Sequence, residues 1–247
     1  MPVAEYIKTR REKGPLHFTL IDPDKQEPQE AGKLAKFVED SGSDAIMVGG
    51  SWGDIFGDRL NKTILEIKKS CKLPVILFSS SAQHISEHAD ALFFMSLFNS
   101  RSVQYVITEQ AKAAIYVKKI GIEPLSMAYL IFDCGSNTAA GWVGDAKLIP
   151  TEKPEIPAAY ALAAKYFGMK IVYLEGGSGA KFTVPARTVA AVKKAVGDDM
   201  LVIVGGGIRD PETAKEKVKA GADIIVTGTI AEENREKLKE IIKAIKE

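Results

Sequence analysis

Eight short apolar segments recur along the chain and give the main secondary-structure signal. Most are near-continuous runs of aliphatic, β-branched and aromatic residues, which is typical of strands that are buried on both faces of a parallel sheet. The pattern therefore predicts a parallel sheet covered by helices. The eight segments are 16–21, 43–48, 74–78, 91–98, 124–132, 170–174, 200–204 and 223–227.

Helical periodicity fills most of the intervals between these segments. Apolar residues share one helical face in 31–38, 103–114 and 238–245. The helix with the clearest ends is 211–220, because Asp210 can cap it, Pro211 suits its first position and Gly221 suits a left-handed stop. Strands and helices are therefore expected to alternate.

The strand count and an internal repeat indicate the fold. Residues 42–50 (GSDAIMVGG) and 221–229 (GADIIVTGT) share glycine, a small residue, aspartate, an apolar strand and a glycine at the exit. Eight such βα units close a (β/α)8 TIM barrel, a fold of about 250 residues. A doubly wound open α/β sheet is the competing fold. We expect one TIM-barrel domain over residues 1–247, because no linker divides the chain.

Two connections depart from the regular unit. Only 12 residues, 79–90, separate the third and fourth segments, close to the lower limit of about 10–12 for a parallel crossover. The third outer helix is therefore expected to be truncated or absent. Residues 133–156 form a long insertion after the fifth strand, of the kind that often makes a functional loop, and should cover the top of the barrel.

Composition narrows the class of function. The 33 Lys and Arg residues nearly balance 32 Asp and Glu residues, for a net charge of +1, so no global field recruits nucleic acid or an anionic membrane. Two cysteines, Cys71 and Cys134, fit a reducing cytosol rather than a disulfide scaffold. Residues 1–14 lack an apolar signal core, and the longest apolar run, 91–98, is too short to span a membrane. We expect a cytoplasmic protein.

Glycines gather at the exits of the last three strands. Without a Cβ, their backbone amides can approach a phosphate, and barrels commonly bind phosphate after strands seven and eight. One glycine alone would indicate only a turn, but three clusters favour a phosphate site. Ser178, between two of these glycines, is expected to bind ligand and not to act as a nucleophile. The clusters are Gly176, Gly177 and Gly179, then Gly205, Gly206 and Gly207, and finally Gly228 with Thr229.

Oxygen ligands stand at the exits of the first two strands. Asp22 ends the first strand, Asp24 follows it across Pro23, and Ser51 ends the second. Magnesium (Mg²⁺) prefers one or two carboxylates together with substrate phosphate oxygens, so Asp22, with Ser51, is a candidate site. An Asp-Pro turn followed by a helix cap is the alternative.

Glu175 ends the sixth strand, and the strand period places Tyr173 on the same face. An acid beside a phenol near a phosphate site is a candidate general base, although Glu175 could instead cap loop amides. His84 and His88 have i,i+4 spacing but no third ligand nearby in the sequence, and are interpreted as surface residues.

Aromatic residues cluster near the exits of strands two, four and five, beside the shortened crossover. Most aromatic residues simply fill a core, but a missing helix here would leave an apolar groove, and such grooves usually have a ligand or partner. The residues are Trp52, Phe56, Phe93, Phe94, Phe98, Tyr129, Phe132 and Trp142.

Five motifs, in this order and spacing, resemble the geranylgeranylglyceryl phosphate synthase family of (β/α)8 prenyltransferases, and residues 141–150 are similar to its longer subgroup. The resemblance implies Mg²⁺-dependent transfer of a geranylgeranyl group from its diphosphate to the 3-hydroxyl of sn-glycerol 1-phosphate. The motifs are HFTLIDPDK, SDAIMVGGSWG, YLEGGSGA, VGGGIRD and VTGT.

The resemblance also implies roles for individual residues. Asp22 and Ser51 would bind the metal, and Glu175 would accept the glycerol hydroxyl proton. Trp142 resembles an aromatic anchor of hexamers, so we expect a homo-oligomer, hexamer or dimer. No membrane span is expected, and any membrane contact would be peripheral. The glycerol phosphate site would comprise Tyr173, Leu174, Glu175, Gly176, Gly177, Ser178, Gly179, Gly205, Gly206, Gly207, Gly228 and Thr229.

Two positions depart from the family pattern. Thr229 stands where many relatives carry Asn, and residues 132–136 (FDCGS) replace the more common Pro-Gly form. Two other interpretations stay open: another phosphate-binding barrel enzyme, such as a sugar-phosphate isomerase or cyclase, or a non-catalytic prenyl-phosphate binding protein.

Overall fold

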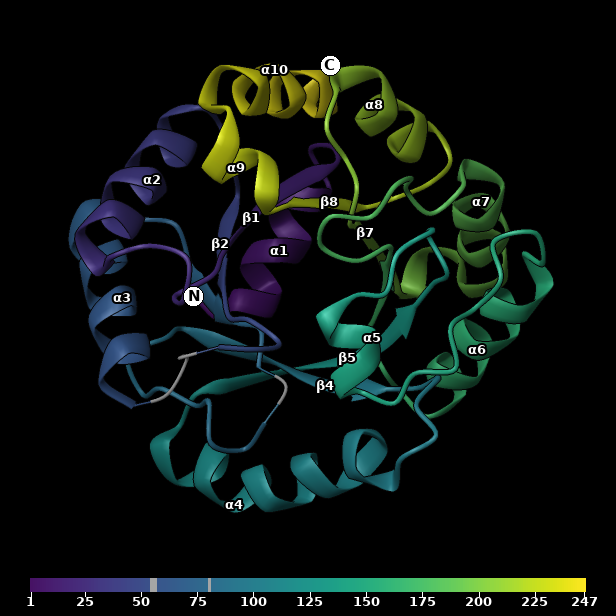
Figure 1. Ribbon diagram of the computed structural model, residues 1–247, viewed down its shortest axis with the longest axis horizontal. Coiled ribbons are helices and arrows are strands. Elements are labelled where there is room, and N and C mark those ends of the chain that lie inside the picture. The colour runs from purple at the N-terminus through teal and green to yellow at the C-terminus, as the bar shows by residue number, and fades with distance from the viewer. Residues whose placement is uncertain (54–56, 80) are drawn as a thin grey trace.

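Eight parallel strands close a barrel in sequence order, as predicted (Figure 1). The computed structural model describes residues 1–53, 57–79 and 81–247. Each predicted strand is present, with ends shifted by no more than two residues. The strands are β1 (Leu16–Ile21), β2 (Ala45–Val48), β3 (Val75–Leu77), β4 (Ala91–Leu97), β5 (Glu123–Ile131), β6 (Ile171–Glu175), β7 (Leu201–Gly205) and β8 (Ile224–Thr227).

Helices surround most of the barrel in Figure 1. The described part of 79–90 contains no helix, which confirms the truncated third unit. The helix predicted at 211–220 is α8 (Pro211–Lys219), capped by Asp210 and followed by Gly221 at a φ of +103°. The others are α1 (Val3–Arg11), α2 (Pro28–Asp40), α3 (Gly57–Ser70), the π-helix η1 (Gln104–Thr108), α4 (Glu109–Ile120), α5 (Ala139–Val143), α6 (Glu155–Tyr166), α7 (Ala186–Val196), the 3₁₀-helix η2 (Gly197–Asp199), α9 (Thr229–Glu233) and α10 (Arg235–Lys246).

Helix α1 closes the amino-terminal end of the barrel. Val3 and Ile7 belong to the apolar cluster that fills the barrel interior, and Figure 1 shows α1 behind the strands. The carboxylate of Glu123, at the start of β5, accepts hydrogen bonds from the amides of Val3 (2.5 Å) and Ala4 (3.1 Å). These bonds satisfy amides that the first turn of a helix leaves free. Among the described residues, α1 thus covers the amino-terminal end of the barrel.

The internal repeat has a structural explanation at the amino-terminal ends of the strands. Asp44, before β2, donates its amide to the carbonyl of His17 (2.8 Å) and accepts from the His17 amide (2.9 Å). Asp223, before β8, makes the same pair of bonds with Val202, both 2.8 Å. The shared aspartate thus joins its strand to the preceding one.

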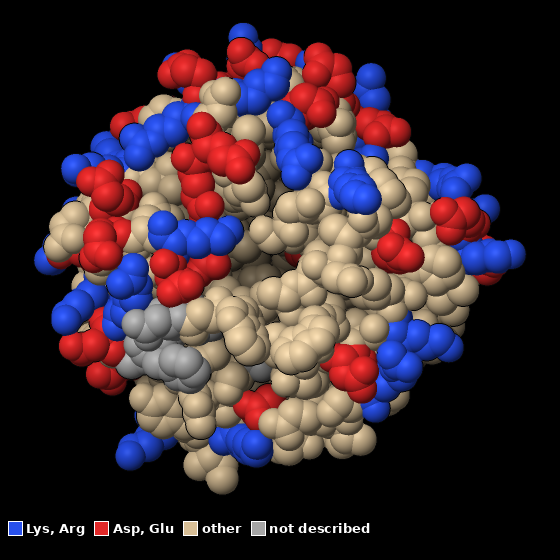
Figure 2. Space-filling model, in the orientation of Figure 1, with Lys and Arg blue, Asp and Glu red and all other residues tan. Residues whose placement is uncertain are grey.

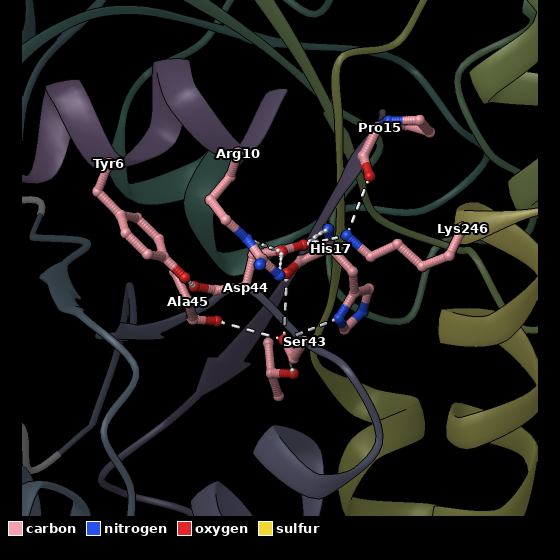
Figure 3. Close-up of polar contacts among 9 residues, drawn as sticks. Tyr6, Arg10, Pro15, His17, Ser43, Asp44, Ala45 and Lys246 are labelled. Carbon is pink, nitrogen blue, oxygen red and sulfur yellow. Dashed lines mark hydrogen bonds and ion pairs between the residues drawn. The ribbon is translucent and has the colours of Figure 1, made fainter. Parts of the chain in front are cut away.

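A buried polar cluster surrounds Asp44 (Figure 3). Arg10 and Lys246 both form ion pairs with its carboxylate. The ring of His17 lies 2.9 Å from the hydroxyls of both Ser43 and Thr227. Burial lowers the pKa of His17 from 6.5 to about 3, although the neighbouring Asp44 charge acts to raise it. His17 is therefore neutral in the folded protein.

Candidate active site

One large cavity opens at the carboxyl-terminal end of the barrel. It encloses about 1630 Å³, including the part open to solvent, and Figure 2 shows the face hollowed near its centre. Its walls come from the strand exits, from α4 and from α5 in the long insertion. The insertion thus covers the top of the barrel, as predicted. The described helices include none that is both long and apolar enough to cross a membrane.

Asp22 and Ser51 both line this cavity. The carboxylate of Asp22 lies against the backbone at the exit of β2, because a Cβ on Gly50 would sit 2.8 Å from Asp22 Oδ1. Burial raises the pKa of Asp22, although a hydrogen bond from the Asp24 amide and the charge of Lys25 both act to lower it. A half-buried carboxylate beside a hydroxyl-bearing residue suits a cation that also takes substrate oxygens. The described residues hold no group of three or more His, Cys, Asp or Glu arranged around a metal position.

Glu175 lies at the end of β6, buried and also facing the cavity. Its carboxylate accepts hydrogen bonds from the Gly177 amide (2.5 Å) and from the phenols of Tyr173 and Tyr129. Burial nevertheless raises the pKa of Glu175 above its ordinary value. A raised pKa makes this carboxylate a stronger base when ionised, as general base catalysis requires.

The glycines beside Glu175 leave no room for a larger side chain. A Cβ on Gly206 would lie 2.6 Å from Glu175 Oε1 and would also meet the Gly177 amide. A Cβ on Gly205 would meet the hydroxyl of Tyr173. These glycines let the exits of β6 and β7 meet around one carboxylate.

The predicted phosphate site is only partly as expected. The Gly176 amide donates to the Gly205 carbonyl (2.9 Å), and the Gly177 amide donates to Glu175, so neither amide is free for a ligand. The Leu174 side chain packs in the outer core between strands and helices. Leu174, Gly176 and Gly205 do not line the cavity, whereas Gly177 lines it with its amide already bonded to Glu175. The predicted residues that line the cavity are Tyr173, Glu175, Gly177, Ser178, Gly179, Gly206, Gly207, Gly228 and Thr229.

Two hydroxyls join the loops after β6 and β8. Ser178 Oγ lies 3.4 Å from Thr229 Oγ1. Gly228, the cap of α9, and Gly207, after β7, line the same part of the cavity. The loops after three successive strands therefore converge, as the glycine clusters predicted.

Away from these polar groups the cavity becomes an apolar trench. Phe78, at the exit of β3, stacks on Tyr173 at a ring-centroid distance of 5.5 Å and meets Tyr129 and Phe93 edge to face. Phe78 was not among the aromatic residues predicted to line the groove, although it ends the predicted third strand. Other apolar residues continue the trench toward α4 and α5, among them Phe94, Met95, Leu97, Tyr105, Ala113, Ala140 and Val143.

The remaining predicted aromatic residues lie elsewhere. Phe132 is buried in the outer core, and Phe98 packs against the same core. Trp52 and Trp142 are 67% and 75% exposed and meet edge to face at 5.9 Å. Phe56 lies outside the described residues.

The interpretation of His84 and His88 as surface residues is wrong for His84. Both side chains are half-buried, and the ring nitrogens of His84 are inaccessible to solvent. Burial lowers the pKa of His84, against the charge of Glu109. The described part of the crossover forms no outer helix, and His84 shares a small pocket with Val48, Leu60 and Phe78.

The model of the PcrB family matches residues 7–247. The chain belongs to the PcrB family. It is 53% identical to the geranylgeranylglyceryl phosphate synthase of Methanococcoides burtonii, covering all of both chains, and 52% identical to that of Pyrococcus furiosus, covering 98% of this chain and 97% of the relative.

A solved relative carries a substrate. This PcrB-family chain matches (S)-3-O-geranylgeranylglyceryl phosphate synthase from Thermoplasma acidophilum in complex with sn-glycerol-1-phosphate, with a TM-score of 0.94, 47% identity and coverage of 100% and 99%. The corresponding enzyme from Thermoplasma volcanium has a TM-score of 0.93 and 43% identity, with coverage of 100% and 98%. The resemblance inferred from the motifs therefore holds for the whole fold.

Proposed function

We propose that this protein transfers a geranylgeranyl group from geranylgeranyl diphosphate to the 3-hydroxyl of sn-glycerol 1-phosphate, releasing diphosphate, in the synthesis of ether lipids. The observation that carries the proposal is that Glu175 and the glycine loops stand at one end of a cavity whose other end is an apolar trench. Full-length relatives with the same named activity support it.

The acceptor phosphate fits the loops after β7 and β8. Gly206, Gly207 and the first turn of α9 line the cavity there, and backbone amides without a Cβ nearby can approach phosphate oxygens closely. Ser178 and Thr229 add hydroxyls at the same place. Such contacts would place the glycerol hydroxyls toward Glu175.

Glu175 accepts the proton of the acceptor 3-hydroxyl in the proposed reaction. The oxygen bonds to the first carbon of the prenyl chain, and the bond between that carbon and the diphosphate oxygen breaks. Tyr129 and Tyr173 hold the carboxylate by hydrogen bonds. The stacked rings of Phe78 and Tyr173 line the path, and aromatic faces stabilise positive charge that grows on an allylic carbon.

We infer that Mg²⁺ is the cofactor and that Asp22, with Ser51, would hold it. When bound, the ion would neutralise the leaving diphosphate. The half-buried carboxylate of Asp22 supports this assignment, because a bound cation would offset the cost of its partial desolvation. Asp24 does not line the cavity and is not assigned as a ligand. With Asp22→Asn, the turnover should fall strongly while the fold survives; unchanged kinetics with full Mg²⁺ dependence would reject the assignment.

The proposal is tested by extraction of a labelled product. Radiolabelled sn-glycerol 1-phosphate is incubated with the protein and geranylgeranyl diphosphate, with Mg²⁺ or with a chelator. Label should pass into the organic phase only with Mg²⁺ present, and Glu175→Gln should abolish most of the rate. If the donor binds but no label is transferred by the wild-type protein, the chain is a prenyl-phosphate binding protein and not a transferase.

We further propose a cytoplasmic homo-oligomer, dimer or hexamer. The described cysteines, Cys71 and Cys134, are free and buried, which fits a reducing compartment. The exposed ring of Trp142 offers an aromatic contact to a second copy. Light scattering should give the mass of an oligomer, and Trp142→Ala should lower the mass if the ring anchors a hexamer.

A further inference from the structure

The apolar trench leaves the barrel on the side of the missing helix. Its outer end is lined by Ala82 and Ile85 from the crossover, by Leu92 and Phe94 from β4, and by Ala113 from α4. A full outer helix would fill this position in a regular barrel. Here a short crossover segment, residues 81–85, forms the wall instead, and we call it the crossover wall.

Because the crossover wall is not helical, its backbone amides need hydrogen-bond acceptors from elsewhere, and Glu109 supplies one. Glu109 Oε2 accepts hydrogen bonds from the Ala82 amide (2.8 Å) and from Ser81 Oγ (3.1 Å). Glu109 is the first residue of α4, 27 positions from Ala82. One carboxylate thus ties the crossover wall to the helix across the trench.

The second oxygen of Glu109 is also engaged. Oε1 accepts from Lys112 Nζ (3.0 Å) and from the side-chain amide of Gln104, in the π-helix that precedes α4. The residue is only 9% exposed. Burial alone would raise the pKa of Glu109, but the hydrogen bonds from Ala82, Lys112 and Ser81 outweigh it and lower the pKa. The carboxylate is therefore ionised at neutral pH, when charge-assisted hydrogen bonds are strongest.

We propose that Glu109 is a positioning residue that holds the crossover wall against the trench and thereby sets the affinity for long prenyl donors. The proposal rests on the proposed function, because it assigns the trench to the prenyl chain. Glu109 touches none of the reacting atoms in this assignment. Glu109 also lines the cavity, and the proposed effect passes through Ala82, whose amide it holds, and through the neighbouring Ile85, which would contact the far end of the chain.

The barrel topology gives this proposal a length dependence. The phosphate loops follow β6, β7 and β8, whereas Glu109 lies outside β4, four strands around the barrel from β8. Figure 1 shows α4 and α9 on opposite sides of the barrel. A geranyl chain has half the carbons of a geranylgeranyl chain, so only the longer chain would reach the crossover wall.

The test measures donor affinity by calorimetry on the full-length protein, without acceptor, for geranyl and geranylgeranyl diphosphate. Glu109→Ala removes both hydrogen bonds to the crossover wall. Glu109→Gln keeps an oxygen that can accept from the Ala82 amide. Lys112→Ala removes only an exposed ion-pair partner and is the matched control, since such pairs contribute little. The kcat of each variant is measured in parallel at saturating substrates.

Glu109→Ala should weaken the binding of geranylgeranyl diphosphate by about fivefold or more, because the end of the long chain loses contacts with the crossover wall. The affinity for geranyl diphosphate should stay within about twofold of wild type, because the short chain does not reach the wall. Glu109→Gln and Lys112→Ala should stay near wild type, and kcat should change little. Equal losses for both donors, or an unchanged geranylgeranyl affinity, would overturn the proposal.

A second variant covers a failure of Glu109→Ala to fold. Ser81→Ala removes one bond to Glu109 and leaves α4 intact, and it should weaken only the longer donor; no selective effect would again overturn the proposal. The binding measurements can be distinguished from a test of the transferase activity. A wild-type protein that binds donor but transfers nothing refutes the transferase activity, while the binding data still decide the role of Glu109.

Discussion

Ser178 Oγ and Thr229 Oγ1 lie 3.4 Å apart, although 51 positions separate the two residues. The contact joins the loop after β6 to the first turn of α9, and both residues line the cavity. Two hydroxyls at this distance can donate to the same phosphate group. The Thr229 hydroxyl is therefore positioned beside Ser178 at the cavity wall.

Thr229→Val removes the hydroxyl and keeps the shape of the side chain. We expect the KM for sn-glycerol 1-phosphate to rise by about tenfold, because a hydrogen bond to a charged group contributes about 1.5–3 kcal/mol. Thr229→Asn, which restores a polar group, should stay closer to wild type. Steady-state kinetics with saturating donor measures both. A wild-type KM for the Thr229→Val variant would show that the phosphate does not bind at the first turn of α9.

Gly228 and Gly206 should respond differently to alanine. A Cβ on Gly228 would meet Leu20 only at ordinary contact distances of 3.5 Å or more, whereas one on Gly206 would clash with Glu175 and the Gly177 amide at a φ of +85°. Gly228→Ala should keep its melting temperature and raise the KM for glycerol phosphate. Gly206→Ala should lose stability and activity together. If Gly228→Ala binds acceptor normally, no phosphate approaches this glycine.

The pH dependence of kcat should report Glu175. Burial raises its pKa above 4.5, and the base acts only when ionised, so kcat should fall with decreasing pH through a value above 4.5. Because phosphate monoesters titrate near pH 6, Glu175→Gln is the control: its residual rate, lower by about 10²–10⁴-fold, should lose this acid limb. The same limb in wild type and variant would assign it to the substrate.

His17 should make stability fall in acid. Its pKa is about 3 when folded and 6.5 when unfolded, so between these values the unfolded chain binds a proton that the folded chain does not. Stability is therefore lost as pH falls below 6.5, by about 1.4 kcal/mol per pH unit from this group. Urea unfolding from pH 6.5 down to about 5 should show a smaller slope for His17→Gln. Parallel slopes would contradict the neutral buried ring.

Much of the barrel and its rim could be predicted because periodicity and glycine position are local signals. Continuous apolar runs identify buried strands, and glycines after three successive strands identify converging loops. The positions of Asp22 and Glu175 follow, since all strands of a parallel barrel end on the same side.

Other features depend on contacts between distant segments. Gly176 and Gly177 look like phosphate donors in the sequence, but their amides already bond to Gly205 and Glu175. Phe78 lies one residue beyond β3, and its contacts with Tyr129 and Tyr173 join distant strands and leave no local signal in the sequence. The bond between Glu109 and Ala82 has no local signature, because it exists only where the crossover folds onto α4.

The central claim is that acceptor and donor occupy one continuous cavity, and a ternary complex tests it most directly. A crystal structure with sn-glycerol 1-phosphate and a non-hydrolysable thio analogue of geranylgeranyl diphosphate should place the phosphate at Gly207 and Thr229 and the 3-hydroxyl at Glu175. The prenyl chain should run past Phe78 to Ala82. A chain bound outside this trench, or a phosphate bound away from the β7 and β8 loops, would contradict the account.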